Sequence, residues 1–289
     1  MEFLRYCEVT IGPLADWQGK GNTGEAVVIR ADGTAGRLRI AFSASKSLTG
    51  DPNKTELTIY GLGRDLRRAM RTELTRVQII AGYESSGRSA AVVAVGAISA
   101  AISTRQGADI TTKLTILDGF GGMVRGAISR SYKGGTPIAH AVKEAAQSMP
   151  GVTVGDVSIV GRLPAKGVQL SGPATAQLNK LADQFGFSWS VQNGVFQAVP
   201  DDGDTGEEFS FTSDRNLVSL SPSVSGPSPG QGGVEIVGKF DARIKPGDRV
   251  AVQSDINPQL SGTYKVTSVT ANFDSHGPAS VQVQAQSIT

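Results

Sequence analysis

The chain is poor in the residues that carry most protein chemistry. Its 289 residues include one cysteine, Cys7, and two histidines, His140 and His276. A single cysteine excludes an intrachain disulfide, and we expect Cys7 to be a small apolar residue buried in an early strand. The two histidines form no local metal-binding or nucleophile–base pattern, so we expect both to be structural or solvent-facing. The composition therefore gives no sign of a metal, a cofactor or a catalytic set.

Net charge and long apolar runs are also scarce. Lysine and arginine number 28 against 26 acidic residues, so the net charge of +2 lacks the basic excess of a dedicated nucleic-acid binder. The longest apolar run, residues 90–101, is interrupted by Gly96 and Ser99 and falls short of the ~18 residues of a membrane helix. The first five residues lack the features of a signal peptide. We therefore expect a soluble cytoplasmic product with no stable membrane insertion.

Glycine and short alternating segments are abundant. The chain contains 36 glycines and 39% hydrophobic residues, which is typical of a loop-rich β protein. In Pro52–Leu62 a turn is followed by alternating apolar and polar residues, and then by glycines that end the strand. Further strands are expected at 6–11, 26–30, 37–43, 75–81, 91–103 and 109–117. This spacing predicts a closed antiparallel β-barrel or sandwich over residues 1–118, with one helix at 64–72.

Residues 119–203 have a mixed α+β pattern. Thr136-Pro137 is typical of a helix start, with the proline as first helical residue. A second helix is expected to begin near Ser171 and Pro173 and to end at Gly186, a residue suited to the C-terminal cap. These helices and the hairpin that follows them predict a small α+β domain.

The hairpin is expected at Asn193-Gly194, the strongest two-residue turn signal in the chain. Folding about it pairs Val191 with Phe196 and Trp189 with Ala198. One face of the hairpin is then apolar and consists of Phe187, Trp189, Val191, Phe196 and Ala198. The opposite face is polar and carries Ser188, Ser190, Gln192 and Gln197.

Residues 204–289 return to a β pattern. Strands are expected at 207–211, 234–239, 249–253, 262–270 and 280–287. Residues 221–233 hold three prolines and four glycines and are expected to form a loop or linker. The predicted plan is therefore mainly β, with two tube-like antiparallel β-barrel domains, 1–118 and 204–289, flanking the α+β domain 119–203.

Two segments resemble chemical sites and are better explained as loops. The acidic residues 201–208 (Asp201, Asp202, Asp204, Glu207 and Glu208) do not follow the ligand order of a calcium loop, so a solvated interdomain loop is favoured. Gly119-Phe120-Gly121-Gly122 follows a strand but lacks the Lys-Ser/Thr ending of a phosphate loop. We interpret it as a domain hinge.

A basic stripe is the one candidate interaction site. Arg64, Arg67, Arg68 and Arg71 fall at i, i+3, i+4 and i+7, which places them on one face of the expected helix. The stripe is explained either by a solvated helix face or by docking on an acidic surface of a neighbouring subunit. Contact with nucleic acid is less favoured because no aromatic residues are interleaved with the arginines.

Several segments resemble, in order, the central baseplate hub proteins of contractile-tailed phages, which are related to the first part of type VI secretion spike proteins. Pro52–Leu62 is similar to that family's "PN-x-x-E-[IL]-T-I-Y-x-L" strand. The other matching segments are Val77–Tyr83, Val95–Ile98, Leu117–Gly119, Ile128–Tyr132, Gly135–Pro137, Leu178–Phe187, Trp189–Val195, Lys245–Asp248 and Gly262–Val269. Each motif is short, and the first 50 residues and the linker at 221–233 do not match.

The resemblance implies a structural protein of the virion tail baseplate, assembled in the host cytoplasm. Hubs of this kind are homotrimers in which each protomer supplies two β-barrels, so that three copies form a pseudo-sixfold ring. The ring joins the sixfold tail tube or distal tube protein to the threefold spike, contacts the tape-measure protein and other baseplate proteins, and lets DNA pass. No catalysis or cofactor is implied.

Two other classes stay open. A tail-associated cell-wall hydrolase needs a carboxylate pair or metal set, for which only the acidic loop is a candidate. A carbohydrate-binding adhesin needs exposed aromatic residues, and the aromatic content of 6% includes only two tryptophans, Trp17 and Trp189.

Overall fold

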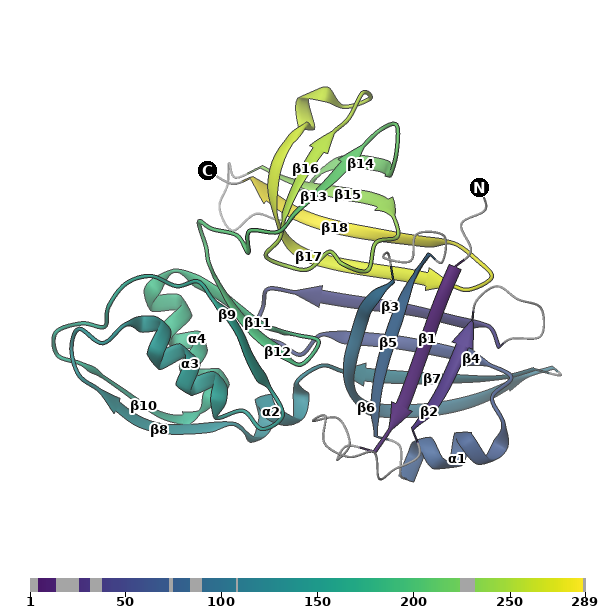
Figure 1. Cartoon of the computed structure of the whole chain (residues 1–289), viewed down its shortest axis with the longest axis horizontal. Helices are drawn as coiled ribbons and strands as arrows, with labels where there is room; N and C mark the ends of the chain where they lie inside the picture. Colours follow the sequence, from purple (N-terminus) through teal and green to yellow (C-terminus); the bar gives the residue numbers. More distant parts are fainter. Residues whose placement is uncertain are drawn as a thin grey trace.

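The computed structural model describes residues 5–13, 26–31, 38–72, 75–83, 90–107, 109–223 and 232–287. Most of these residues form β-strands, and the largest element is a 13-stranded sheet in the described part of the chain (Figure 1). Its first strands are β1 (Arg5–Gly12), β2 (Val27–Ala31), β3 (Ile40–Ser47), β4 (Lys54–Tyr60), β5 (Arg76–Tyr83), β6 (Ala91–Gln106) and β7 (Asp109–Leu117). Its last strands are β13 (Glu208–Thr212), β14 (Leu217–Ser223), β15 (Gly233–Lys239), β16 (Arg249–Gln253), β17 (Gly262–Asp274) and β18 (Ala279–Ser287). The expected mainly β fold is confirmed.

The first and last parts of the chain share this one sheet. Its order is β14-β15-β18-β17-β3-β4-β7-β6-β5-β1-β2, with β16 and β13 branching from β17. The connection is the antiparallel pair β17–β3, in which Ser268 lies opposite Ser47 and Asp274 opposite Ala41. Figure 1 shows the two groups of strands joined along this line.

The prediction of closed antiparallel barrels is wrong. Strand β3 pairs with β4 on one edge and with β17 on the other, so it has no edge left with which to close a ring. In the last part, the side chain of Asn216 bonds the backbone of Ser210 and Thr212 where a β13–β14 ladder would be needed for closure. Strand β13 also pairs with β16 in parallel, not antiparallel.

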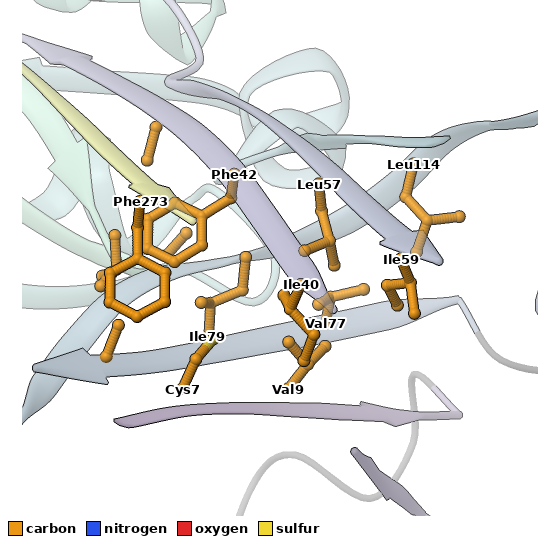
Figure 2. Close-up of a cluster of buried hydrophobic side chains, with 14 of the residues drawn as sticks. Cys7, Val9, Ile40, Phe42, Leu57, Ile59, Val77, Ile79, Leu114 and Phe273 are labelled. Carbon is orange, nitrogen blue, oxygen red and sulfur yellow. The ribbon is translucent and has the colours of Figure 1, made fainter. Parts of the chain in front are cut away.

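A shared core lies inside the curled first part of the sheet. Alternation along β4 turns Thr55, Leu57 and Ile59 inward, and the other strands contribute in the same way. Figure 2 shows this cluster, in which Phe42 of β3 stacks on Phe273 of β17 with ring centroids 5.2 Å apart. Cys7 is buried in the cluster, as expected. The last part of the chain thus contributes to the core of the first.

The middle of the chain forms two small sheets and three helices. The helices are α2 (Phe120–Arg125), α3 (Ile138–Gln147) and α4 (Ala174–Phe185), and the strands are β8 (Ala127–Tyr132), β9 (Thr153–Val157), β10 (Val168–Pro173), β11 (Phe187–Gln192) and β12 (Val195–Pro200). α3 and α4 lie between the β8–β10 pair and the three-stranded sheet β11-β12-β9 (Figure 1). The expected α+β character of this region is confirmed, whereas the domain boundaries at residues 118 and 203 stay predictions.

Several local expectations are confirmed and others are wrong. α1 (Arg64–Thr72) has the expected bounds, and Gly186 caps α4 in the left-handed conformation. Pro137 precedes α3 as its cap instead of being its first residue, and residues 168–173 form β10 before α4 begins. The expected hinge at Gly119–Gly122 is largely the helix α2. The expected linker begins as strand, because β14 continues to Ser223.

Candidate functional site

The tip of the β11–β12 hairpin is the point where the middle of the chain docks on the large sheet. The register is the expected one, with Val191 opposite Phe196 and Trp189 opposite Ala198. Asn193 and Gly194 both have positive φ, 56° and 81°, as a type I′ turn requires. The turn exposes two neighbouring backbone N–H groups at its end, and these N–H groups point toward Asp118.

Asp118, the residue after β7, holds this turn. Its carboxylate accepts the N–H of Asn193 at Oδ2 and the N–H of Gly194 at Oδ1, the latter at 2.8 Å. Burial raises the pKa of Asp118 to about 7, although both backbone hydrogen bonds and the positive charges of Lys46 and Arg76 favour the ionised form. Lys46 is itself buried, which lowers its pKa to about 8. The result is a buried polar joint with charges of both signs.

A second set of hydrogen bonds joins the hairpin to the β3–β4 turn. Asn53 donates from Nδ2 to the carbonyl of Val191 at 2.7 Å and to Oε1 of Gln192 at 3.0 Å. Gln192 donates in turn to the carbonyl of Ser47 at 2.9 Å and to Oγ of Ser190 at 3.0 Å. Ser190 and Gln192 are therefore buried, although they lie on the polar face of the hairpin.

Close backbone approach makes the joint tight. A Cβ at Gly50 would lie 2.4 Å from Cζ2 of Trp189, so only glycine fits there without movement. Gly119 has φ +64°, and a Cβ there would lie 2.9 Å from Cγ1 of Val191. Trp189 also donates from Nε1 to Oδ1 of Asn179 at 2.8 Å. Such packing favours a fixed orientation of the middle region on the sheet.

The same hairpin contacts the last part of the chain. Gln197 donates to the carbonyl of Pro246 at 2.8 Å, and Nζ of Lys265 donates to the carbonyl of Pro200 at 2.6 Å. One hairpin thus connects all three regions of the chain. We name this set of contacts around Asp118, Asn53 and the hairpin the junction.

Two cavities border the junction. One of about 700 Å³ lies between the start of β6, strand β13 and residues 241–248. The other, of about 330 Å³, is lined by Arg76, Asp118, Gly194, Arg125 and glycines of the α2 region. In the described residues, no group of three or more histidine, cysteine, aspartate or glutamate side chains is arranged to hold a metal ion.

The basic stripe lies on the outer face of α1. Leu62 and Met70 are buried and Leu66 is partly buried in the core, so the opposite face carries the arginines. Arg64 and Arg68 are exposed, and Arg67 is half-buried and donates to the carbonyl of Gly63 at 3.4 Å. The backbone of Arg71 continues the helix, and its side chain lies outside the described set. The structure does not bring these arginines to the junction.

The residues considered for hydrolysis, metal binding or sugar binding make contacts within the protein itself. Asp204 forms an ion pair with Arg249, which holds the pKa of its carboxyl below the usual range, the opposite of what a general acid needs. Asp201 accepts a hydrogen bond from Ser188. Trp189 is 2% exposed and presents no ring to a sugar, while Trp17 lies outside the described residues.

The two histidines are exposed surface residues. His140 lies 3.8 Å from Glu144 on α3, and its ring packs edge-on against Tyr132. His276 shares a hydrogen bond of 2.9 Å with the hydroxyl of Ser275. Neither histidine is near the junction network, in agreement with the expected structural or solvent-facing roles.

Sequence reasoning missed the junction because its residues looked like ordinary turn and strand residues. Asn53 is a turn former and Asp118 ends a strand next to glycine, so both are explained locally. Two features together could have indicated the junction. The tight Asn193-Gly194 turn has free N–H groups that need acceptors, and Asp118 at the end of a strand offers a carboxylate.

The large open sheet with the inserted α+β region has the fold of phage tail proteins. A tail protein of Neisseria meningitidis has a TM-score of 0.65 at 10% identity, covering 99% of this chain and 97% of its own. A 43 kDa tail protein of prophage MuSo2 from Shewanella oneidensis has a TM-score of 0.61 at 11% identity, covering 96% of each chain.

A component of the type VI secretion system of E. coli, described as similar to the T4 bacteriophage tail proteins gp27 and gp5, has a TM-score of 0.59 at 12% identity. The match covers 88% of this chain and 74% of that one. At this identity these similarities concern the fold. No curated protein sequence matches the chain.

The sequence itself identifies the family. The family model described as baseplate hub gp41 matches residues 26–280, which is most of the chain. The chain therefore belongs to the baseplate hub gp41 family and is a structural protein of the tail baseplate. No helix among the described residues is long and apolar enough to cross a membrane.

Proposed function

We propose that the protein is the central hub of the baseplate and forms a homotrimeric ring with pseudo-sixfold symmetry. The observation that carries this proposal is the continuous sheet formed by two groups of strands, β1–β7 and β13–β18, through the pair β17–β3. Three copies would supply six such groups, which suits a part that meets a sixfold tube on one side and a threefold spike on the other.

The junction gives each protomer the rigidity that this task requires. A symmetry adaptor transmits load between its neighbours, so its two β parts must keep a fixed relation. Three sets of contacts oppose bending between the two β parts. They are the β17–β3 ladder, the Phe42–Phe273 stack, and the buried hydrogen bonds of Asp118 and Asn53. The α+β region lies to one side of the large sheet (Figure 1), and in this proposal it contacts other baseplate proteins.

The proposed ring works without catalysis and encloses a passage for DNA. The net charge of +2 suits a passage, because a strongly basic lining would bind phosphates and hold DNA back. Its proposed partners are the tail tube or distal tube protein, the spike and the tape-measure protein, with assembly in the host cytoplasm.

Electron microscopy of the purified protein tests this proposal. Negatively stained particles are averaged without imposed symmetry, and mass photometry of the same sample reports the copy number. We expect threefold rings with a central hole and the mass of three chains of 30.0 kDa. Compact monomers at the highest soluble concentration, or rings with another copy number, would contradict the proposed trimer.

A further inference from the structure

Within the residues that the structure describes, the hairpin of β6 and β7 carries a long strand edge without a partner. β5 pairs with β6 only as far as Ala97, and Ile98 then donates its N–H to the carbonyl of Thr75. From there to Gln106, β6 pairs only with β7 in the described part of the chain. The hairpin projects beyond the body of the sheet (Figure 1).

The hydrogen-bonding groups of this edge can be assigned from the register. The pair Gln106–Asp109 closes the hairpin, and pairs in an antiparallel ladder alternate between bonded and non-bonded. Ser103 and Thr112 are then a non-bonded pair, in agreement with the 3.2 Å between their hydroxyl oxygens. The backbone N–H and C=O groups of Ala101, Ser103 and Arg105 therefore point outward from the hairpin.

Up to Thr104, before the charged Arg105, this edge carries no side chain of the kinds that normally prevent strand addition. Residues 99–104 contain no charged residue and no proline, and Ile102 is 61% exposed. Proteins usually protect exposed edges with charge, proline or a covering element. An unprotected edge of this length is a template for an added strand.

The helix α1, which carries the basic stripe, lies next to β6. α1 contacts β6, and the chain leaves α1 to enter β5 at the position where β5 stops covering β6. The helix carries four arginines and one acidic residue, Asp65. A strand added at the open edge would thus lie near a helix with a net positive charge.

We propose that the β6 edge from Ala101 to Arg105 binds an extended acidic segment of another protein. The segment pairs through its backbone with the outward groups of Ala101, Ser103 and Arg105. Its carboxylates face Arg64 and its neighbours on α1. This binding site goes beyond the hub role and does not depend on whether the chain forms a trimer.

Fluorescence anisotropy with a defined peptide tests the proposal. The probe is a labelled ten-residue peptide in which glutamate alternates with threonine, and the comparison peptide has lysine in place of glutamate. The variant Ser103→Pro removes the outward N–H without removing a bond to β7, and Ser103→Ala is its matched control because it loses the same hydroxyl. Arg64→Glu with Arg67→Glu reverses the helix charge, and Lys133→Glu with Lys166→Glu makes the same charge change on exposed residues elsewhere.

We expect the acidic peptide to bind the wild type, the alanine control and the lysine control alike. Binding should weaken roughly tenfold or more in Ser103→Pro and in the arginine variant, and should weaken with salt. The lysine peptide should not bind. Amide exchange should slow at Ala101, Ser103 and Arg105 on addition of the acidic peptide, while Ile102 and Thr104 should not change.

Three results would overturn the proposal. The first is no binding of the acidic peptide to the wild type, and the second is equal binding to Ser103→Pro or to the arginine variant. The third is concentration-dependent protection of the edge amides without peptide, which would identify a second copy of this chain as the occupant.

Discussion

Replacing Asp118 with asparagine should remove a pH dependence of stability that runs opposite to that of most carboxylates. The folded state raises the pKa of Asp118 from 3.8 to about 7 because the group is buried. The unfolded chain therefore releases this proton at lower pH than the folded protein does. The stability that Asp118 contributes is complete below about pH 4 and is lost as the pH rises toward about 7.

The magnitude follows from proton linkage. Between the two pKa values the free energy of unfolding falls by about 1.4 kcal/mol per pH unit, or about 3 kcal/mol from roughly pH 4.5 to 6.5. Lys46, whose positive charge acts on Asp118, has a pKa of about 8 and therefore loses its proton above this pH range. Asp118→Asn also loses one of the two acceptors for the turn N–H groups, a pH-independent cost of about 1–3 kcal/mol.

The assay is urea unfolding of the wild type and Asp118→Asn at several pH values in this range. The matched control is Asp51→Asn, because Asp51 is an exposed aspartate in the β3–β4 turn. We expect the free energy of unfolding of the wild type minus that of Asp118→Asn to fall by about 3 kcal/mol as the pH rises from roughly 4.5 to 6.5, so that the variant ends at least as stable as the wild type. The Asp51→Asn control should not reproduce this change. A constant difference for Asp118→Asn would refute the buried, proton-linked joint.

Two further substitutions test the packing of the junction. Trp189→Ala should lower the free energy of unfolding by about 3 kcal/mol or more, because it empties a fully packed aromatic site and frees Asn179. An unchanged melting temperature would show that the hairpin face is not buried. Asn53→Ala should cost about 2–3 kcal/mol, because the carbonyl of Val191 and the side chain of Gln192 lose their buried donor. Calorimetry measures this cost, and a loss below the experimental error would mean that water replaces the amide.

Local structure was predictable where one short signal determines it. The Asn193-Gly194 turn fixed the hairpin register, because few sequences allow positive φ at two consecutive positions. The bounds of α1 followed from the glycines before it and agree with the helical spacing of its arginines. α2 was missed because Gly121 and Gly122 have low helix propensity, and only tertiary contacts keep the helix formed.

The long-range architecture was not predictable from the same signals. Alternation shows which face of a strand is buried, but it does not show which strand lies beside it. The pairing of β3 with β17 could therefore not be predicted from the sequence of either strand. The burial of Ser190 and Gln192 was missed for a related reason. Polar residues are normally assigned to the solvent, and only the position of Asn53 shows that they have partners inside the protein.

The most direct test of the central claim is a cryo-electron microscopy reconstruction of an assembled tail that contains this protein, refined without imposed symmetry at the end of the tube. The account predicts three copies in one ring between tube and spike, with β1–β7 and β13–β18 of each copy at alternating positions of a pseudo-sixfold arrangement. Six copies in the ring, or copies placed only at the periphery of the baseplate, would contradict it.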